Sequence, residues 1–268
     1  MNDAQRASFE KDGYLILSNS LSPELLQELI LAVDRLWSEH SSRSSDTYLH
    51  QFDFLCRDRV FVDLLELPAI LSIILDILGW NIYLYHAHLD VNQPIAQENA
   101  PALSWHRDNA RMNNDIRDGY YPLLAIKVSY WLSDASESNR GNLCLIPGSH
   151  KWNYSEKLRG NNTDFPEGSI PLLVKPGDIV VFDSRVWHSR SNNYSDVTRK
   201  VLFYGYSYRW LRARDDVKIP VELLRSATPI QLQLLTRTMD SGAYDPHDDE
   251  TPLRHTLLLP PSAKNGKP

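Results

Sequence analysis

Cysteine is scarce in this chain, which has only Cys56 and Cys144 among 268 residues. Two thiols in unrelated contexts cannot build a disulfide framework or a tetrahedral thiolate metal site, and we expect both to be buried structural thiols. Long basic runs are also missing, and 28 Lys and Arg stand against 34 Asp and Glu, for a net charge of −6. Nucleic acid is therefore not expected as a partner, because nothing in the chain would follow a phosphate backbone.

Long apolar segments are absent as well. No run approaches the roughly 18 consecutive apolar residues of a membrane-spanning helix, and the N-terminus has no basic region leading into an apolar one. We therefore expect a cytoplasmic protein with no membrane partner. The composition, 42% hydrophobic and 23% charged, is typical of a folded chain, and we expect residues 1–268 to form a single domain.

The first third of the chain predicts helices and the remainder predicts strands. Ser22 and Pro23 suit the start of a helix whose apolar residues recur at helical spacing through Trp37, and a second helix over 68–78 ends at Gly79. A strand is expected at 14–17, and later strands at 82–91, 125–132, 142–146, 172–174, 178–182 and 201–208. Helices followed by short strands predict an α+β protein with an antiparallel sandwich or barrel, such as a jelly roll.

His106 and Asp108 lie two residues apart in the segment SWHRD. On an extended backbone their side chains point to the same face, so together they can chelate one ion. A third neutral nitrogen would complete a face of two histidines and one carboxylate, which suits iron(II) and dioxygen chemistry because other coordination positions stay open. His188, presented by a short connector after an expected strand, is the candidate for this third ligand.

Arg199 follows His188 by eleven residues, at the start of the last expected strand. A planar guanidinium that points inward there can hold a carboxylate by two parallel hydrogen bonds. A buried arginine of this kind beside an iron site implies a dicarboxylate cosubstrate.

Four segments occur in a characteristic order, FEKDGYLILSNSLSPELL, SWHRD, NLCLIPGSHK and PGDIVVFDSRVWHSRSNNYSDVTRK. Each is a weak signal alone, but their shared order is a strong one. Together they resemble the phytanoyl-CoA dioxygenase-like family of iron(II)- and 2-oxoglutarate-dependent oxygenases, and the resemblance runs from Phe9 to Trp210.

The resemblance implies a double-stranded β-helix, or jelly-roll, core flanked by N-terminal helices. It implies that His106, Asp108 and His188 bind iron(II) and that Arg199 binds the distal carboxylate of 2-oxoglutarate. With O2, such an enzyme oxidises a C–H bond of a small organic molecule, by hydroxylation, desaturation, cyclisation or epimerisation. Asp108 argues against a related halogenase, in which a small residue leaves room for halide. The substrate stays open among a secondary metabolite, an amino acid and an acyl thioester.

Further site residues are expected from position. Lys127 and Ser129 share one face of the strand over 125–132 and are candidates for contact with the cosubstrate. Arg107 and Arg111 are substrate candidates. The long polar stretch 109–122, which contains Arg111, is expected to act as a lid over the site.

Several other polar residues have competing interpretations. His86 and His88 alternate on an expected strand with Asp90, and they are either histidines satisfied within the sheet or substrate contacts. His150 is expected to close a turn by hydrogen bonds and not to bind metal. The charged run RDDVK, residues 214–218, is expected to be a solvated surface.

Two other functions compete with the dioxygenase. The first is a cupin-like metal enzyme without 2-oxoglutarate, in which Arg199 would form a structural ion pair. The second is a non-catalytic jelly-roll binding protein. Formation of succinate separates the dioxygenase from the first, and the intact triad together with Arg199 argues against the second.

Overall fold

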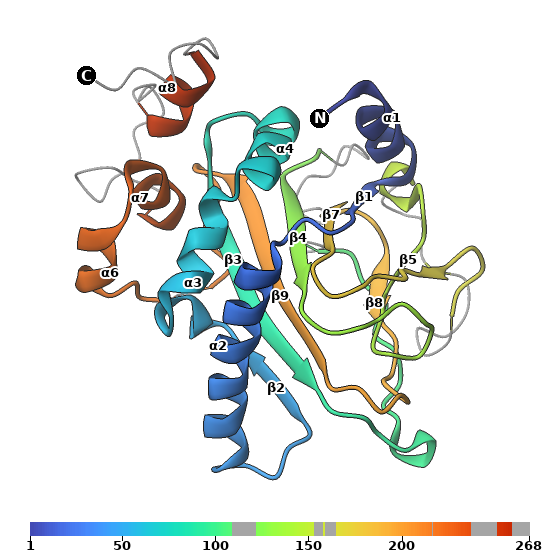
Figure 1. Ribbon diagram of the computed structural model, residues 1–268. Coiled ribbons are helices and arrows are strands. Elements are labelled where there is room, and N and C mark those ends of the chain that lie inside the picture. The colour runs from blue at the N-terminus through green and yellow to red at the C-terminus, as the bar shows by residue number, and fades with distance from the viewer. Residues whose placement is uncertain (109–121, 153–157, 159–164, 216, 237–250, 259–268) are drawn as a thin grey trace.

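Two antiparallel sheets form the centre of the molecule (Figure 1). The computed structural model describes residues 1–108, 122–152, 158, 165–215, 217–236 and 251–258. The larger sheet has the order β1-β7-β4-β9-β3-β2 and the smaller has the order β6-β5-β8. The strands are β1 (Tyr14–Leu17), β2 (Tyr48–Gln51), β3 (Ile82–Asn92), β4 (Ala125–Trp131), β5 (Leu143–Leu145), β6 (Ile170–Pro171), β7 (Ile179–Asp183), β8 (His188–Arg190) and β9 (Arg199–Tyr208). This arrangement confirms the predicted α+β class with a jelly-roll core.

Helices precede and follow the strands and also connect β1, β2 and β3. They are α1 (Asp3–Asp12), α2 (Pro23–Ser41), α3 (Arg59–Asp63), α4 (Pro68–Leu78), α6 (Val221–Ser226), α7 (Pro229–Thr236) and α8 (Pro252–Leu258). Short 3-10 turns are η1 (Asp53–Cys56), η2 (Leu64–Glu66), η3 (Gln97–Asn99) and η4 (Ser149–Lys151). The start of α2 is as predicted, because the Ser22 hydroxyl accepts a hydrogen bond from the Leu25 amide and Pro23 opens the helix. The predicted helix over 68–78 is also confirmed.

The two faces of the large sheet have different roles. One face carries Val128, Tyr130 and Tyr204, which pack in the main core with residues of α2 and α4. In Figure 1, α2, α3 and α4 lie on the opposite side of this sheet from β5 and β8. The other face, here called the inner face, packs Trp131 and Phe203 against residues of the small sheet. Strand alternation therefore directs Lys127, His88 and their neighbours to the space between the sheets.

Some sequence expectations need correction. The expected strand over 172–174 is displaced, since the strand is Ile170–Pro171 and Val174 forms only an isolated bridge with Ala135. Cys144 is buried as expected, whereas Cys56 is partly exposed at the end of η1. The polar stretch 109–122 lies outside the described residues except for its last position, so the expected lid stays a prediction.

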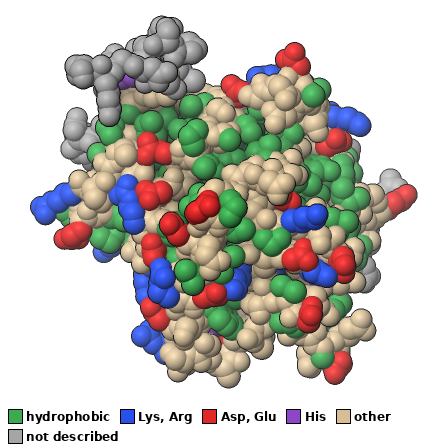
Figure 2. All heavy atoms as spheres, viewed as in Figure 1, with side chains coloured by type: hydrophobic (Ala, Val, Ile, Leu, Met, Phe, Trp, Pro, Cys, Tyr) green, Lys and Arg blue, Asp and Glu red, His purple; other side chains and the backbone are tan. Residues whose placement is uncertain are grey.

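Surface properties agree with the composition. On the face shown in Figure 2, acidic and basic side chains are interspersed. In the described part of the chain, no helix combines the length and apolar character needed to cross a membrane.

Candidate metal centre

Three side chains, from His106, Asp108 and His188, converge between the sheets, with ligand atoms that all lie within 4.8 Å of one another. The backbone positions them directly. His106 and His188 exchange two backbone hydrogen bonds, each 2.9 Å long, and the Asp108 amide donates to the Ser184 carbonyl oxygen at 2.9 Å. The sequence-predicted triad is therefore assembled by β-pairing between segments about 80 residues apart in sequence.

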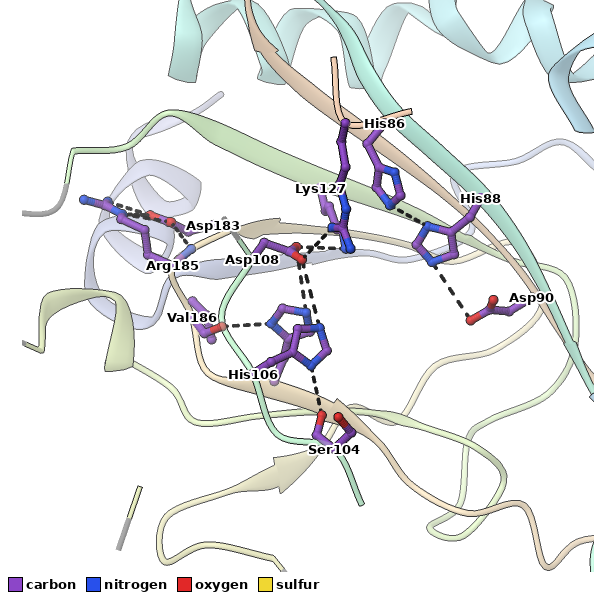
Figure 3. A network of polar contacts seen from close by, with 12 residues as sticks. His86, His88, Asp90, Ser104, His106, Asp108, Lys127, Asp183, Arg185 and Val186 are labelled. Carbon is purple, nitrogen blue, oxygen red and sulfur yellow. Dashed lines mark hydrogen bonds and ion pairs between the residues drawn. The ribbon is translucent and has the colours of Figure 1, made fainter. Parts of the chain in front are cut away.

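The ring orientation of both histidines suits metal binding, and Figure 3 shows the ring of His106 beside Asp108. Nδ1 of His106 lies 2.9 Å from the Ser104 carbonyl oxygen, and Nδ1 of His188 lies 2.9 Å from the Val186 carbonyl oxygen. Each Nδ1 must carry the proton, because a carbonyl oxygen only accepts, and Nε2 is left as a lone pair. The two Nε2 atoms face Asp108 at 4.0 and 3.8 Å. Two neutral imidazoles and one carboxylate are a donor set that fits iron(II).

Two cationic side chains contact the buried carboxylate of Asp108. Lys127 Nζ lies 2.8 Å from Oδ2, and Arg214 Nη1 lies 3.2 Å from Oδ1. Burial alone would raise the pKa of Asp108, but the nearby charges, that of Lys127 above all, hold it well below its usual range. Burial, followed by the neighbouring His106, lowers the pKa of His188 to about 3. At neutral pH the site therefore contains an ionised carboxylate beside an imidazole without charge.

Arg199 lies on the inner face with only 2% of its surface exposed. Its Nη1 donates to Asn92 Oδ1 at 2.8 Å and lies 3.5 Å from Asp90 Oδ2. The guanidinium stands over the rings of Trp131 and Phe203, at 5.2 and 5.9 Å from their centroids. Burial lowers the pKa of Arg199 to about 10, which leaves it charged at neutral pH. Among the described residues, its Nε has no hydrogen-bond partner, so the guanidinium retains capacity for an acid.

Gly141 makes room for this arginine. Its φ is +71°, and a Cβ atom there would come within 2.4 Å of the Arg199 Cδ atom. Glycine is therefore required for two reasons, backbone conformation and close approach.

A cavity of about 200 Å³ joins these groups. Its lining contains His106 and His188 of the triad, together with Arg199 and Lys127. The remaining lining residues are His50, His86, His88, Asp90, Leu143, Phe182, Ser189, Arg190, Phe203 and Arg214. His86, which hydrogen-bonds Asp215, also lines a second cavity of about 240 Å³ with more aromatic and aliphatic walls, among them Tyr85, Phe52 and Leu235.

Not every expected residue reaches this cavity. The Ser129 hydroxyl is fully buried, where it donates weakly to the Val180 carbonyl oxygen at 3.4 Å and accepts from Trp131 at 3.1 Å. Arg107 points elsewhere, because its Nη2 donates to the Ser149 carbonyl oxygen and its guanidinium stacks on Trp187. Neither lines the cavity, and Arg111 lies outside the described residues.

Other residues at the cavity did not emerge from the sequence. The expectation that 214–218 is a solvated surface is wrong for Asp215, whose side chain is largely buried, whereas Arg214 is exposed as expected but still reaches the site. The Arg214 amide donates to the Tyr85 carbonyl oxygen at 2.9 Å, which folds the segment after β9 back onto β3. Arg214 then reaches Asp108, and Asp215 reaches His86 at 2.7 Å. The only local signal was the position of this run a few residues after the expected strand over 201–208.

His50 was also missed, and His150, which was expected to close a turn, instead contacts the distant residue Glu10. Nδ1 of His50 lies 2.6 Å from Asp90 Oδ1, because β2 pairs with β3 and sets these two residues opposite each other. His150 lies outside the cavity, with its Nε2 3.1 Å from the Glu10 carbonyl oxygen.

Several proteins are similar to this chain in sequence or in fold. An ectoine dioxygenase from Nocardia farcinica is 24% identical over 238 residues, covering 77% of this chain and 78% of that protein. An L-proline trans-4-hydroxylase from Streptomyces griseoviridis is 28% identical over 261 residues, covering 84% of this chain and 93% of that protein. The crystal structure of HygX from Streptomyces hygroscopicus with nickel and 2-oxoglutarate bound has the same fold, with a TM-score of 0.67, 16% identity and coverage of 83% of this chain and 93% of that one.

Family membership rests on the sequence itself. The sequence model of the phytanoyl-CoA dioxygenase (PhyH) family matches residues 9–201, a span that contains all three residues of the triad and Arg199. The chain belongs to the phytanoyl-CoA dioxygenase family.

Proposed function

We propose that this protein is an iron(II)- and 2-oxoglutarate-dependent dioxygenase that oxidises a C–H bond of a small organic molecule. One observation carries the proposal: two histidines of a His-Asp-His triad line the same cavity as a buried, charged arginine. Iron(II) held by His106, Asp108 and His188 would supply the oxidation by O2, in which 2-oxoglutarate is converted to succinate and carbon dioxide. The family match supports this function.

Arg199 binds the distal carboxylate of 2-oxoglutarate in this proposal. Asn92 and Asp90 hold the guanidinium by Nη1, and the Trp131 and Phe203 rings confine it on the inner face. A fixed cation in a dry pocket binds an acid strongly, since water does not compete for it. Asp90 offsets the buried charge when no acid is present.

Lys127, for which contact with the cosubstrate stays a prediction, has a further role in this proposal. Its ammonium contacts Asp108, so we assign it to orienting that carboxylate and keeping it ionised, with Nζ facing the cavity. Ser129 supports the strand by its bonds to Val180 and Trp131 and is not assigned to the cosubstrate. Arg111 remains a candidate for contact with the substrate.

The primary substrate is a small polar metabolite. Relatives named for ectoine and L-proline, and a HygX structure with hygromycin B bound, support this class over an acyl thioester. The cavity of about 200 Å³ also suits a compact molecule.

On the sequence grounds given above, we propose a single-domain enzyme of the cytoplasm.

Succinate formation tests the proposal. Purified protein supplied with iron(II), 2-oxoglutarate and O2 should form succinate, faster when a substrate is present. The Asp108→Asn variant should form none, whereas Asp183→Asn is the matched control, because Asp183 is an equally buried aspartate paired with Arg185 outside the cavity. If the protein is a cupin-like enzyme without 2-oxoglutarate, or a binding protein, neither the wild type nor the two variants will form succinate.

A further inference from the structure

A line of polar side chains follows β3 along the inner face (Figure 3). His86, His88 and Asp90 alternate with apolar residues, so all three face the cavity. His86 Nε2 lies 2.9 Å from His88 Nδ1, and His86 Nδ1 lies 2.7 Å from Asp215 Oδ2. The line therefore begins at Asp215, on the segment that follows β9.

Hydrogen-bond chemistry fixes the protons along this line. Asp215 acts as an acceptor, since its Oδ2 also accepts from the Ala87 amide at 2.9 Å, so His86 Nδ1 carries the proton. Neutral His86 then has a lone pair on Nε2, which accepts from the proton on His88 Nδ1. Neutral His88 is left with a lone pair on its own Nε2. Burial lowers the pKa of both histidines, in keeping with the neutral forms.

The far end of His88 agrees with this assignment. Its Nε2 lies 4.0 Å from Asp90 Oδ2, beyond hydrogen-bonding distance, as expected when two acceptors face each other. The ring is fixed by stacking on Phe203, with centroids 4.6 Å apart and planes at 17°. The Nε2 lone pair of this fixed ring thus lies on the side of Asp90, and both residues line the cavity.

We propose that Asp215 and His86 are positioning residues that hold His88 Nε2 as a hydrogen-bond acceptor for an O–H or N–H group of the substrate. The inference rests on the proposed function and narrows its substrate class to molecules with such a donor. The dianion of 2-oxoglutarate has no donor, so it is not the partner. The two histidines therefore differ: His86 is satisfied within the protein, whereas His88 contacts the ligand.

The tautomer of His88 is the direct test. Long-range ¹H–¹⁵N correlation on ¹⁵N-labelled protein, loaded with diamagnetic zinc in place of iron, separates protonated from unprotonated ring nitrogens. In the wild type, His88 should be protonated on Nδ1. Asp215→Ala removes the acceptor for His86 Nδ1, so the tautomers with the proton on Nε2 should become populated for both histidines. Asp215→Asn keeps an acceptor oxygen and should preserve the wild-type tautomer. An Nε2 proton on His88 in the wild type would overturn the proposal.

A pair of probes tests access to the lone pair. Ethylene glycol should shift the His88 Nε2 resonance, while 1,2-dimethoxyethane, which has the same skeleton without donors, should not. Equal shifts with both probes, or none with either, would overturn the ligand role. Binding of 2-oxoglutarate to the same wild-type sample is measured separately by calorimetry. If His88 has the expected tautomer but 2-oxoglutarate does not bind, the proposed function is wrong and the assignment of His88 still stands.

Discussion

His106 and His188 are joined by two reciprocal backbone hydrogen bonds, each 2.9 Å long. Their imidazoles consequently lie side by side, with ring centroids 4.3 Å apart. Because main-chain pairing holds both positions, the geometry of the site does not depend on the ligand side chains themselves. A variant that lacks one of these imidazoles can therefore lose the metal and still fold.

Substitution of His188 by Ala should abolish iron binding while the protein remains folded. Two remaining ligands hold iron(II) poorly, and the backbone bridge to His106 does not need the imidazole. Iron content after gel filtration and the far-UV circular dichroism spectrum check the two halves of the prediction. Stoichiometric iron in the variant would remove His188 from the ligand set.

Replacing Arg199 by Leu should raise the half-saturating concentration of 2-oxoglutarate at least about thirtyfold, because losing one partner of a buried ion pair costs on the order of 2–5 kcal/mol. Arg199→Lys should lose less, since the charge survives without the fork. Iron binding should be retained in both. Arg190→Leu is the control, as Arg190 lines the same cavity but stacks on Tyr48. An unchanged requirement in Arg199→Leu would mean that another residue anchors the cosubstrate.

A methyl group at position 141 should displace Arg199. In Gly141→Ala the new Cβ would meet the Arg199 Cδ atom at 2.4 Å, so affinity for 2-oxoglutarate should fall while iron content stays the same. Gly168→Ala separates this clash from backbone strain, because Gly168 also has a positive φ of +79° but no atom within 4 Å of the added Cβ. Calorimetric titration with 2-oxoglutarate compares the two; equal affinities would show that Gly141 does not act through Arg199.

Acid should destabilise the metal-free protein partly through His188. Burial lowers its pKa to about 3 from an ordinary 6.5, so below about pH 6.5 the unfolded chain binds a proton that the folded chain does not. This contribution to stability is full above about pH 6.5 and declines toward pH 3, by about 2 kcal/mol at about pH 5. The urea midpoint should thus fall between about pH 7.5 and pH 5, and fall less in His188→Leu. Parallel falls would contradict the assignment.

Local sequence pattern predicted much of this molecule. The cap at Ser22 and the helical spacing after it located α2, and the His106–Asp108 spacing brought two ligands to one face. In these cases the structure is determined by contacts between residues that are close in sequence, so a local sequence pattern predicts it. His188 and Arg199 were candidates from their places beside expected strands, and the resemblance to a family joined them to the same site, since no local rule joins position 106 to position 188.

Features created by long-range pairing could not be predicted. His50 reaches Asp90 only because β2 pairs with β3, and Asp215 reaches His86 only because the chain after β9 turns back to Tyr85. Ser129 was expected to contact the cosubstrate. It lies on the inner face, as strand alternation predicts, but it is fully buried and does not line the cavity. Strand alternation predicts which face a side chain takes, and not what packs over it.

Anaerobic titration of the iron(II)-loaded protein with 2-oxoglutarate tests the central claim most directly. A 2-oxo acid that chelates iron(II) gives a weak visible charge-transfer band. We predict that the band will grow to saturation at one equivalent of 2-oxoglutarate, will be absent in Asp108→Ala, and will need a much higher concentration in Arg199→Leu. A wild-type protein that binds iron but gives no band at saturating 2-oxoglutarate would contradict the account.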